Sequence, residues 1–425
     1  MKTNNLSAIA NKDKIPFSKG YSLVASLNVP EWFLKFKRLG FETYLKNYNS
    51  VNSEVKNFIE KDDFKLLDFD VLPSLDMFLK YQMPDVEAYT IVIVNGRYYS
   101  DFSTDEELPF SVFSDGIACS LNDDSEFLDG KLKCDDNALV ALNSAYLSNG
   151  VVIDIADGEK LLKPIHIISI VISDDEKFFV NPRIFVNVGK NISVDIIESN
   201  LSFDEKYFEN KVCQFNIGKN SNVNHYKYYN VSGNSLLAEN NFFNIETSSK
   251  FNQAVFYKKA GVVNSFYEFD VKNRASAESN ISLFAKLKEN FDMTVHIKHK
   301  EDDATSNVSL FATLDDEARV NFTTSVECEK NVKGIDTKQL SKMLINSSRA
   351  VGRIKPFQNI ASEKVKAYHG AVMSGIQEND LFFLESRGID RDTAKNLILK
   401  SCLCGMLQKI YDEKIYDVFY NLICL

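Results

Sequence analysis

The sequence predicts a mainly β protein whose core is a parallel β-helix flanked by helical regions. Beyond Gly150, almost every segment is short, rich in β-branched and aromatic residues, and bounded by Gly, Asn, Asp or Ser. Similar segments recur in steps of 29, 28 and 26 residues, starting at Asn187, Asn216, Asn244 and Asp270. A period of this size is typical of stacked coils. A β-sandwich built from hairpins would supply similar strands, but it would not need the period.

The region before the repeats is expected to be largely helical. Residues 30–82 carry apolar side chains at a period near 3.6, beginning with Trp32. Residues 90–102 resemble a hairpin, because Asn95-Gly96 is a strong signal for a type I′ turn. A short helix is expected at residues 136–148.

The C-terminal region returns to a helical pattern. We expect one helix that ends at Gly388 and a second one capped by Asp390. The second helix carries two lines of apolar residues, which is more than one neighbour requires. Packing on the solenoid and docking of another protein both remain open for it. The residues assigned to partner binding are Leu397, Ile398, Leu403 and Leu407.

These patterns divide the chain into three parts. The expected domains are an N-terminal helical region at 1–90, a β-helix core at 91–375 with its clearest repeats at 151–330, and a C-terminal helical region at 376–425.

Composition narrows the classes of function. The net charge of -10 and the absence of a run of basic residues argue against nucleic-acid binding. The first residues form no apolar signal segment, and no stretch of eighteen apolar residues occurs, so neither secretion nor membrane insertion is expected. Seven scattered cysteines suit a reducing compartment. A cytoplasmic location is therefore predicted.

Motifs for catalysis are also missing. The two Gly-Lys pairs are followed by Asn in strand corners and do not form a phosphate cradle, so no ATP hydrolysis is expected. His296 and His299 should lie on opposite faces of one strand, where they cannot share a metal ion. His166 and His225 are single histidines within strands. A β-helix enzyme acting on polysaccharides is kept as an alternative, although the strands lack a ladder of paired carboxylates.

His369 is the one histidine with a distinctive setting. Gly370 and Ala371 follow it directly, which predicts a tight corner that leaves the imidazole projecting from the end of the β-rich body. Such an imidazole can ligate a metal, shuttle a proton, or simply bond its own loop.

Several segments together resemble the SufB and SufD proteins of iron-sulfur cluster assembly, and SufD more closely. The resemblance rests on residues 141–167, 181–199, 299–306 and 366–398, including KAYHGAVMSGIQENDLFFLESRG. Where SufB has a Gln-Cys-Asp-Ser segment, this chain has Gln339-Leu340-Ser341-Lys342 and so lacks the thiol. Where SufB follows its C-terminal histidine with Glu, His369 is followed by Gly370. The SufB paralogue remains the alternative assignment.

The resemblance implies a right-handed parallel β-helix that acts as a non-catalytic scaffold. In that family picture, the chain pairs with SufB, its C-terminal helical region receives the ATPase SufC, and a homodimer is the alternative when SufB is absent. His369 matches the metal ligand that SufD contributes to a transient iron-sulfur cluster shared with SufB. The resemblance implies that this chain alone holds no cluster stably. Ala367 stands where many SufD proteins have Cys, so imidazole is the strong ligand left in the motif.

Overall fold

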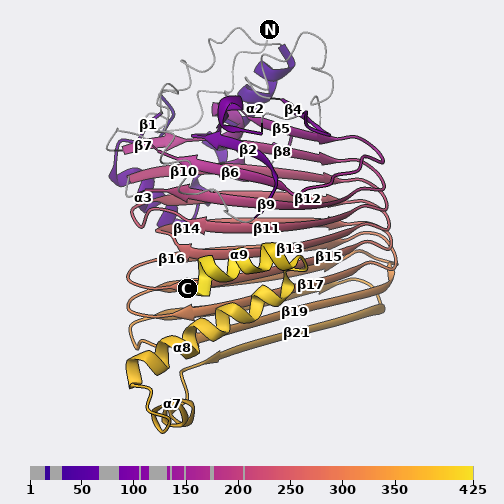
Figure 1. The fold of residues 1–425 in the computed structure, drawn as a ribbon. Helices are drawn as coiled ribbons and strands as arrows, with labels where there is room; N and C mark the ends of the chain where they lie inside the picture. The colour runs from indigo at the N-terminus through magenta and orange to yellow at the C-terminus, as the bar shows by residue number, and fades with distance from the viewer. Residues whose placement is uncertain are drawn as a thin grey trace.

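Two facing parallel sheets wind into a β-solenoid, as the computed structural model shows (Figure 1). The structure describes residues 15–19, 31–66, 86–104, 107–113, 132–134, 136–147, 150–172, 177–203 and 206–424. Successive strands of the solenoid alternate between the two sheets, and each strand pairs in parallel with the strand one coil away. The predicted parallel β-helix is therefore confirmed, and the sandwich alternative is wrong.

The strands fall into an 11-stranded sheet A and a 10-stranded sheet B. Sheet A contains β1 (Lys65–Leu66), β4 (Ser111–Phe113), β5 (Val151–Ile155), β7 (Lys177–Val180), β8 (Arg183–Val188), β10 (Lys206–Ile217), β12 (Leu236–Ile245), β14 (Val262–Val271), β16 (Asn290–His299), β18 (Arg319–Cys328) and β20 (Val351–Ile360). Sheet B contains β2 (Tyr89–Val94), β3 (Arg97–Tyr98), β6 (Ile165–Val171), β9 (Ser193–Ser202), β11 (Asn222–Asn230), β13 (Lys250–Lys259), β15 (Ser276–Ala285), β17 (Thr305–Leu314), β19 (Lys333–Ile345) and β21 (Lys364–Ser374).

The corners from sheet A to sheet B share one backbone device. Each corner between β8 and β19 holds a residue with left-handed φ, a conformation that Asn and Asp tolerate better than most residues. These residues are Asn191, Asn220, Ser248, Arg274, Asp303 and Asn331. The predicted Gly-Lys-Asn corners are thus confirmed, and Gly218 is needed because a Cβ there would meet the Gly189 carbonyl carbon at 2.6 Å.

The N-terminal helices cover one end and one side of the solenoid. They are α2 (Glu31–Asn47), η3 (Tyr48–Ser50), α3 (Ser53–Lys61), η4 (Ser100–Phe102) and α6 (Ala138–Tyr146). The expected helical region is confirmed at 31–61, residues 65–66 form a strand instead, and residues 67–82 lie outside the described residues. The hairpin is confirmed by the pairing of β2 with β3 and by positive φ at Asn95 and Gly96. The helix expected at residues 136–148 is confirmed as α6, which Asn137 caps.

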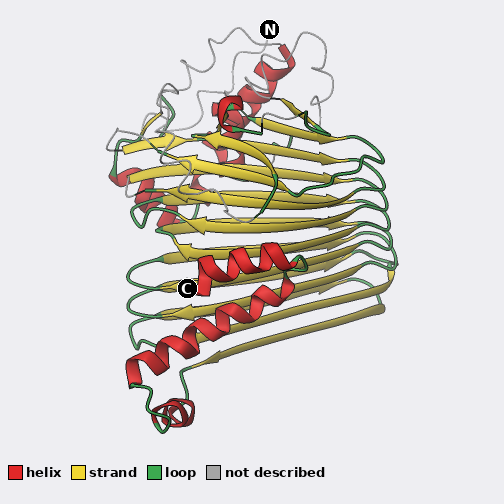
Figure 2. Ribbon diagram, viewed as in Figure 1, coloured by secondary structure: helices red, strands yellow, loops and turns green. Residues whose placement is uncertain are grey.

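The C-terminal helices fold back over sheet B (Figure 2). They are α7 (Glu378–Glu385), α8 (Arg391–Cys404), η6 (Gly405–Lys409) and α9 (Glu413–Cys424). Gly388 has the predicted left-handed φ of 83°, and Asp390 caps α8 by accepting from the Thr393 amide at 3.0 Å. Phe419 of α9 packs against Phe256 of sheet B, with ring centroids 5.3 Å apart.

None of the helices in the described part of the chain combines the length and the apolarity needed to cross a bilayer. Cys404 takes part in a disulfide bond, whereas Cys213 and Cys328 are free thiols.

The interior of the solenoid is mainly apolar and contains a buried ion network. Lys211 donates to Glu198, and Lys227 donates to Glu239, and all four side chains are at most 1% exposed. Burial alone would raise the pKa of both carboxyls, but the two ammonium groups overcome this and hold the pKa of Glu198 and Glu239 below the usual value. Two positive and two negative charges therefore balance inside the core.

We predict that Lys227→Met destabilises the solenoid by about 3–5 kcal/mol, because Glu239 keeps its charge but loses its ammonium partner. Urea unfolding followed by circular dichroism measures the effect. Adding Glu239→Gln should restore much of the lost stability. The control is Lys190→Met, which breaks an exposed pair with Asp157 and should leave the midpoint unchanged. Equal midpoints for Lys227→Met and Lys190→Met would contradict a buried, balanced network.

Candidate functional site at the open end of the solenoid

The last two strands, β20 and β21, leave one end of the solenoid open. In the described part of the chain, β20 pairs only with β18, and β21 pairs only with β19. Each strand therefore presents an edge of backbone groups that no further coil satisfies. Pro356 removes one donor from β20, whereas β21 contains no proline. The edge of β21 is the better template for an added strand.

Large apolar side chains gather at this open end. Six of them are between 39% and 57% exposed: Leu340, Val351, Phe357, Tyr368, Val372 and Met373. They come from β19, β20 and β21, the final strands of both sheets. The register places Leu340, Tyr368 and Val372 on the outer face of sheet B, and Val351 and Phe357 on the outer face of sheet A. Exposed apolar side chains beside unpaired strand edges are typical of a protein interaction surface.

His369 lies in the middle of β21, opposite Gln339 of β19. The predicted corner at this position is wrong, because Gly370 and Ala371 continue the strand and the chain turns earlier, at residues 361–363. The expectation that the imidazole sits at the end of the β-rich body is confirmed. Of the five histidines in the chain, His369 is the one classed as exposed.

The register places His369 on the interior face of the open end. Gln339 is 1% exposed, donates to the Phe357 carbonyl at 3.2 Å and accepts from Gln358 at 3.3 Å. Since paired residues share a face and side chains alternate along a strand, His369 points to the same side as Gln339, together with Ala367 and Ala371. These small neighbours leave room beside the imidazole for a group supplied from outside the chain.

The other histidines are engaged inside the protein or on its flank. Burial lowers the pKa of His166 and of His299 to about 4, and each ring bonds a serine hydroxyl at 2.9 Å. His225 bonds Glu198 at 3.1 Å within the buried network. His296 is half-buried near Glu327, so the predicted placement of His296 and His299 on opposite faces is confirmed.

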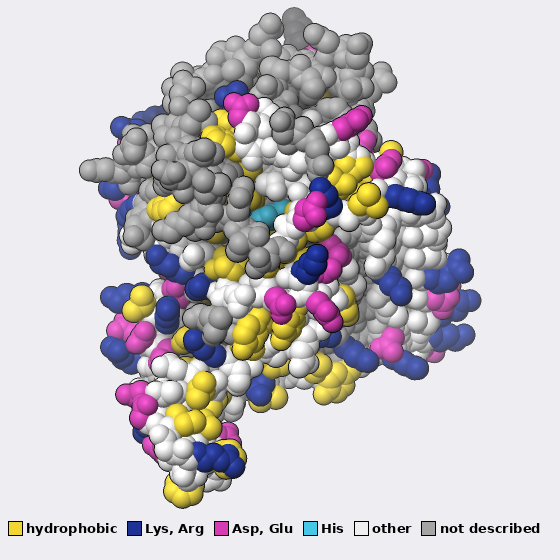
Figure 3. Space-filling model, viewed as in Figure 1, with side chains coloured by type: hydrophobic (Ala, Val, Ile, Leu, Met, Phe, Trp, Pro, Cys, Tyr) yellow, Lys and Arg dark blue, Asp and Glu magenta, His cyan; other side chains and the backbone are white. Residues whose placement is uncertain are grey.

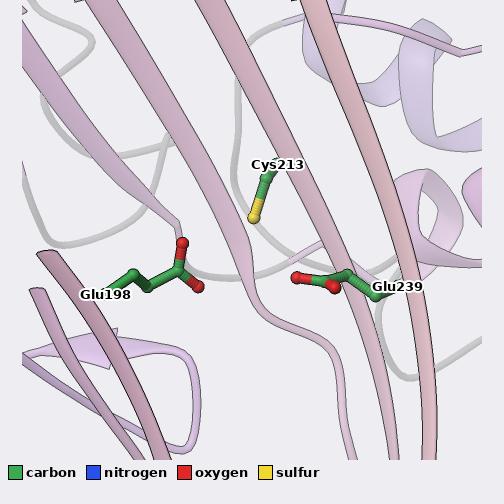
Figure 4. A group of neighbouring side chains, drawn as sticks. All are labelled: Glu198, Cys213 and Glu239. Atoms are coloured by element: carbon green, nitrogen blue, oxygen red, sulfur yellow. The ribbon is translucent and has the colours of Figure 1, made fainter. Parts of the chain in front are cut away.

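Glu198, Cys213 and Glu239 approach one another in the interior (Figure 4), with one potential ligand atom from each within 4.8 Å of the others. Two observations argue against a metal ion there. The ammonium groups of Lys211 and Lys227 already neutralise both carboxylates. Burial also raises the pKa of the Cys213 thiol to about 12, which keeps it protonated and a poor ligand. Lys211 and Lys227 thus neutralise the negative charge of this cluster.

Sequence reasoning missed this network, although the repeat contains the signal. Glu198 and Lys227 are 29 residues apart, and Lys211 and Glu239 are 28 apart, so the coil period brings each acid beside a base.

The four residues assigned to partner binding do not form one surface. Leu397 is 46% exposed, Ile398 is half-buried, and Leu407 is fully buried in a cluster against sheet B. The side chain of Leu403 lies outside the described residues. Exposed apolar side chains occur instead on α7, where Phe382 is 71% exposed. α7 projects beyond the open end of the solenoid (Figure 1).

Comparison with known proteins agrees with this architecture. Residues 170–402 match the family model of the SUF system FeS cluster assembly SufBD core domain, and residues 30–167 match that of the SufBD protein N-terminal region. An iron-sulfur cluster assembly SufBD family protein of Synechocystis is 23% identical over 372 residues, which is 83% of this chain and 82% of that protein.

Two shorter matches lie in eukaryotic relatives. The chloroplastic protein ABCI7 of Arabidopsis thaliana is 31% identical over 100 residues, or 24% of this chain and 21% of the relative. The iron-sulfur cluster assembly protein SufD of Plasmodium berghei is 30% identical over 79 residues, or 19% of this chain and 6% of the relative. The core match alone spans more than half of the chain. On this evidence the chain belongs to the SufB/SufD family of SUF iron-sulfur cluster assembly proteins and is most like SufD.

Proposed function

We propose that this chain is a non-catalytic scaffold subunit of a SUF iron-sulfur cluster assembly complex, paired with a SufB-like paralogue through its open end. The observation that carries the proposal is that the last coil combines unpaired strand edges, exposed apolar side chains on its outer faces and an exposed histidine on its interior face. A paralogue with the same fold would offer matching edges, and burying the apolar patch stabilises the pair by about 25 cal/mol per Å² before the costs of association.

His369 is the proposed contribution of this chain to the cluster, which is the cargo of the complex and not its resident cofactor. An imidazole alone is a weak anchor for iron, whereas an imidazole combined with thiolates is a suitable ligand set. The interior face of β21 offers His369 between Ala367 and Ala371 and no cysteine. Thiolates must therefore come from across the interface, so the site is complete only when the paralogue is bound.

The C-terminal helices are the proposed docking element for the SufC-like ATPase. Leu407 and α9 pack on sheet B, so they hold the element in place. Phe382 of α7, which projects beyond the solenoid, and Leu397 of α8 remain exposed. A homodimer through the same open end is the alternative state when the paralogue is absent.

The pairing surface can be tested by placing charges on it. We expect Phe357→Asp combined with Val372→Asp to weaken binding of the SufB-like paralogue at least about tenfold, because both side chains would carry charge into an apolar interface. Size-exclusion chromatography and calorimetry measure the loss. The matched control is Leu162→Asp, since Leu162 is 88% exposed in the corner between β5 and β6, near the opposite end. Unchanged affinity in the double variant would place the interface elsewhere.

His369→Ala should leave folding intact, because the side chain is exposed, and should lower iron retention by the reconstituted complex at least about tenfold. Iron analysis and visible absorbance of the assembled cluster provide the readout. His296→Ala, on the flank of the solenoid, is the control and should retain the parental yield. If the two variants assemble equal amounts of cluster, His369 is not a ligand.

Docking of the ATPase should be tested with point substitutions and not by truncation. Removal of the whole C-terminal region would uncover Tyr226, Tyr228 and Phe256, which pack against Phe419. We expect Phe382→Asp combined with Leu397→Asp to reduce SufC-like binding at least about tenfold, whereas Tyr420→Asp on α9 should have little effect. Surface plasmon resonance distinguishes the two. Full binding by the double variant would rule out this face.

A further inference from the structure

A groove crosses the corners that lead from sheet B to sheet A. β13 joins β14 through Ala260 and Gly261 alone, whereas the neighbouring corners span residues 231–235 and 286–289. Gly261 permits this close approach, because a Cβ there would meet the Ser235 carbonyl oxygen at 2.4 Å. The short corner leaves a hollow of about 790 Å³, and an adjoining hollow of about 610 Å³ shares Lys288, Glu317 and Arg349 with it. We call the two together the corner groove.

The corner groove is lined by more cations than anions. Lys258, Lys288 and Arg319 line it and have no ion-pair partner among the described residues, and Lys286 lies over the Phe284 ring. Figure 3 shows Lys and Arg side chains, with Asp and Glu among them, along the left-hand edge of the molecule. A basic groove stands out on a chain with a net charge of -10.

The acidic side chains of the groove are mostly engaged with the protein itself. Glu289 accepts from the backbone amides of Lys286 and Ala260, at 3.0 and 3.3 Å. Asp316 accepts from the Leu287 amide at 2.9 Å, and Glu317 pairs with Arg349 at 2.8 Å. Glu54 of α3, at the far end, is the remaining carboxylate in the lining. The lining has six Lys and Arg side chains against these four carboxylates, so its net charge is positive.

Leu287 adds an apolar contact point between two of these cations. It has a left-handed φ of 56°, which is uncommon for a bulky side chain, and it is 65% exposed at the rim of the groove. The corner conformation thus turns an apolar side chain out of the core, where a ligand can contact it.

We propose that the corner groove binds an extended acidic segment of a protein partner, with an apolar residue of that segment resting on Leu287. The lining runs over the corners of successive coils, from Asn230 to Arg349, so the groove is elongated and suits an extended chain. A compact small molecule would instead favour an enclosed pocket with converging polar groups. This inference goes beyond the proposed function, since most of the lining lies on earlier coils and only Arg349 adjoins the last coil, beside Val351.

The probe is a fluorescein-labelled twelve-residue peptide of Asp and Glu with one central Leu, titrated with the full chain and followed by anisotropy. The groove variant combines Lys258→Glu, Lys288→Glu and Arg319→Glu. The control combines Lys219→Glu, Lys250→Glu and Lys330→Glu, exposed residues on the opposite corner column that also lack ion-pair partners among the described residues. Both variants change the net charge equally. We expect at least about a tenfold loss of affinity for the groove variant and less than about twofold for the control.

The apolar contact has its own test. Leu287→Ser should weaken binding of the Leu peptide about threefold and leave a peptide with Ser in its place unaffected. The proposal is overturned by equal losses in the groove and control variants, by the absence of saturable binding in low salt, or by inorganic polyphosphate binding as tightly and with the same sensitivity to the groove variant.

Discussion

The in-register stacking of coils is the constraint on which the rest of the structure depends. From β10 to β18 the strands of sheet A pair residue for residue, so each interior side chain has its counterpart one coil away. Side chains alternate along a strand, so a slip of β11 by one residue would turn Lys227 out of the interior. Glu239 on β12 would then stay inside without its ammonium partner. The buried ion network therefore ties the free energy of the core to one register, and the same register places His369 on the interior face.

Much of this fold could be predicted because corners and caps depend on local backbone chemistry. Asn191 and Asn220 occupy left-handed corners, and Gly388 and Asp390 bound the C-terminal helices, so each is visible in the sequence. The setting of His369 could not be predicted in this way. Gly370 suggests a turn, but it continues the strand, and a Cβ there would meet Leu340 at 3.1 Å and Tyr368 at 3.2 Å. Gly370 therefore makes room for the Leu340 and Tyr368 side chains and does not form a turn.

The candidate site was only partly visible for a related reason. Residues such as Lys211 and Glu198 are usually read as solvent-exposed, and only the coil period reveals that they meet inside. Likewise, the helical pattern shows that α8 and the turn after it have two apolar lines, but not that sheet B covers Leu407 and leaves Leu397 exposed. Tertiary packing decides which apolar line stays exposed, and a local sequence pattern does not contain that information.

Within the described chain, the two ends of the solenoid differ, and this asymmetry links structure to function. α2 and α6 pack together at one end, whereas β20 and β21 end the other without a covering coil. The most direct test is light scattering of this chain co-expressed with SufB-like and SufC-like proteins. We expect one complex that contains all three chains. A chain that stays monomeric in the presence of both partners would contradict it.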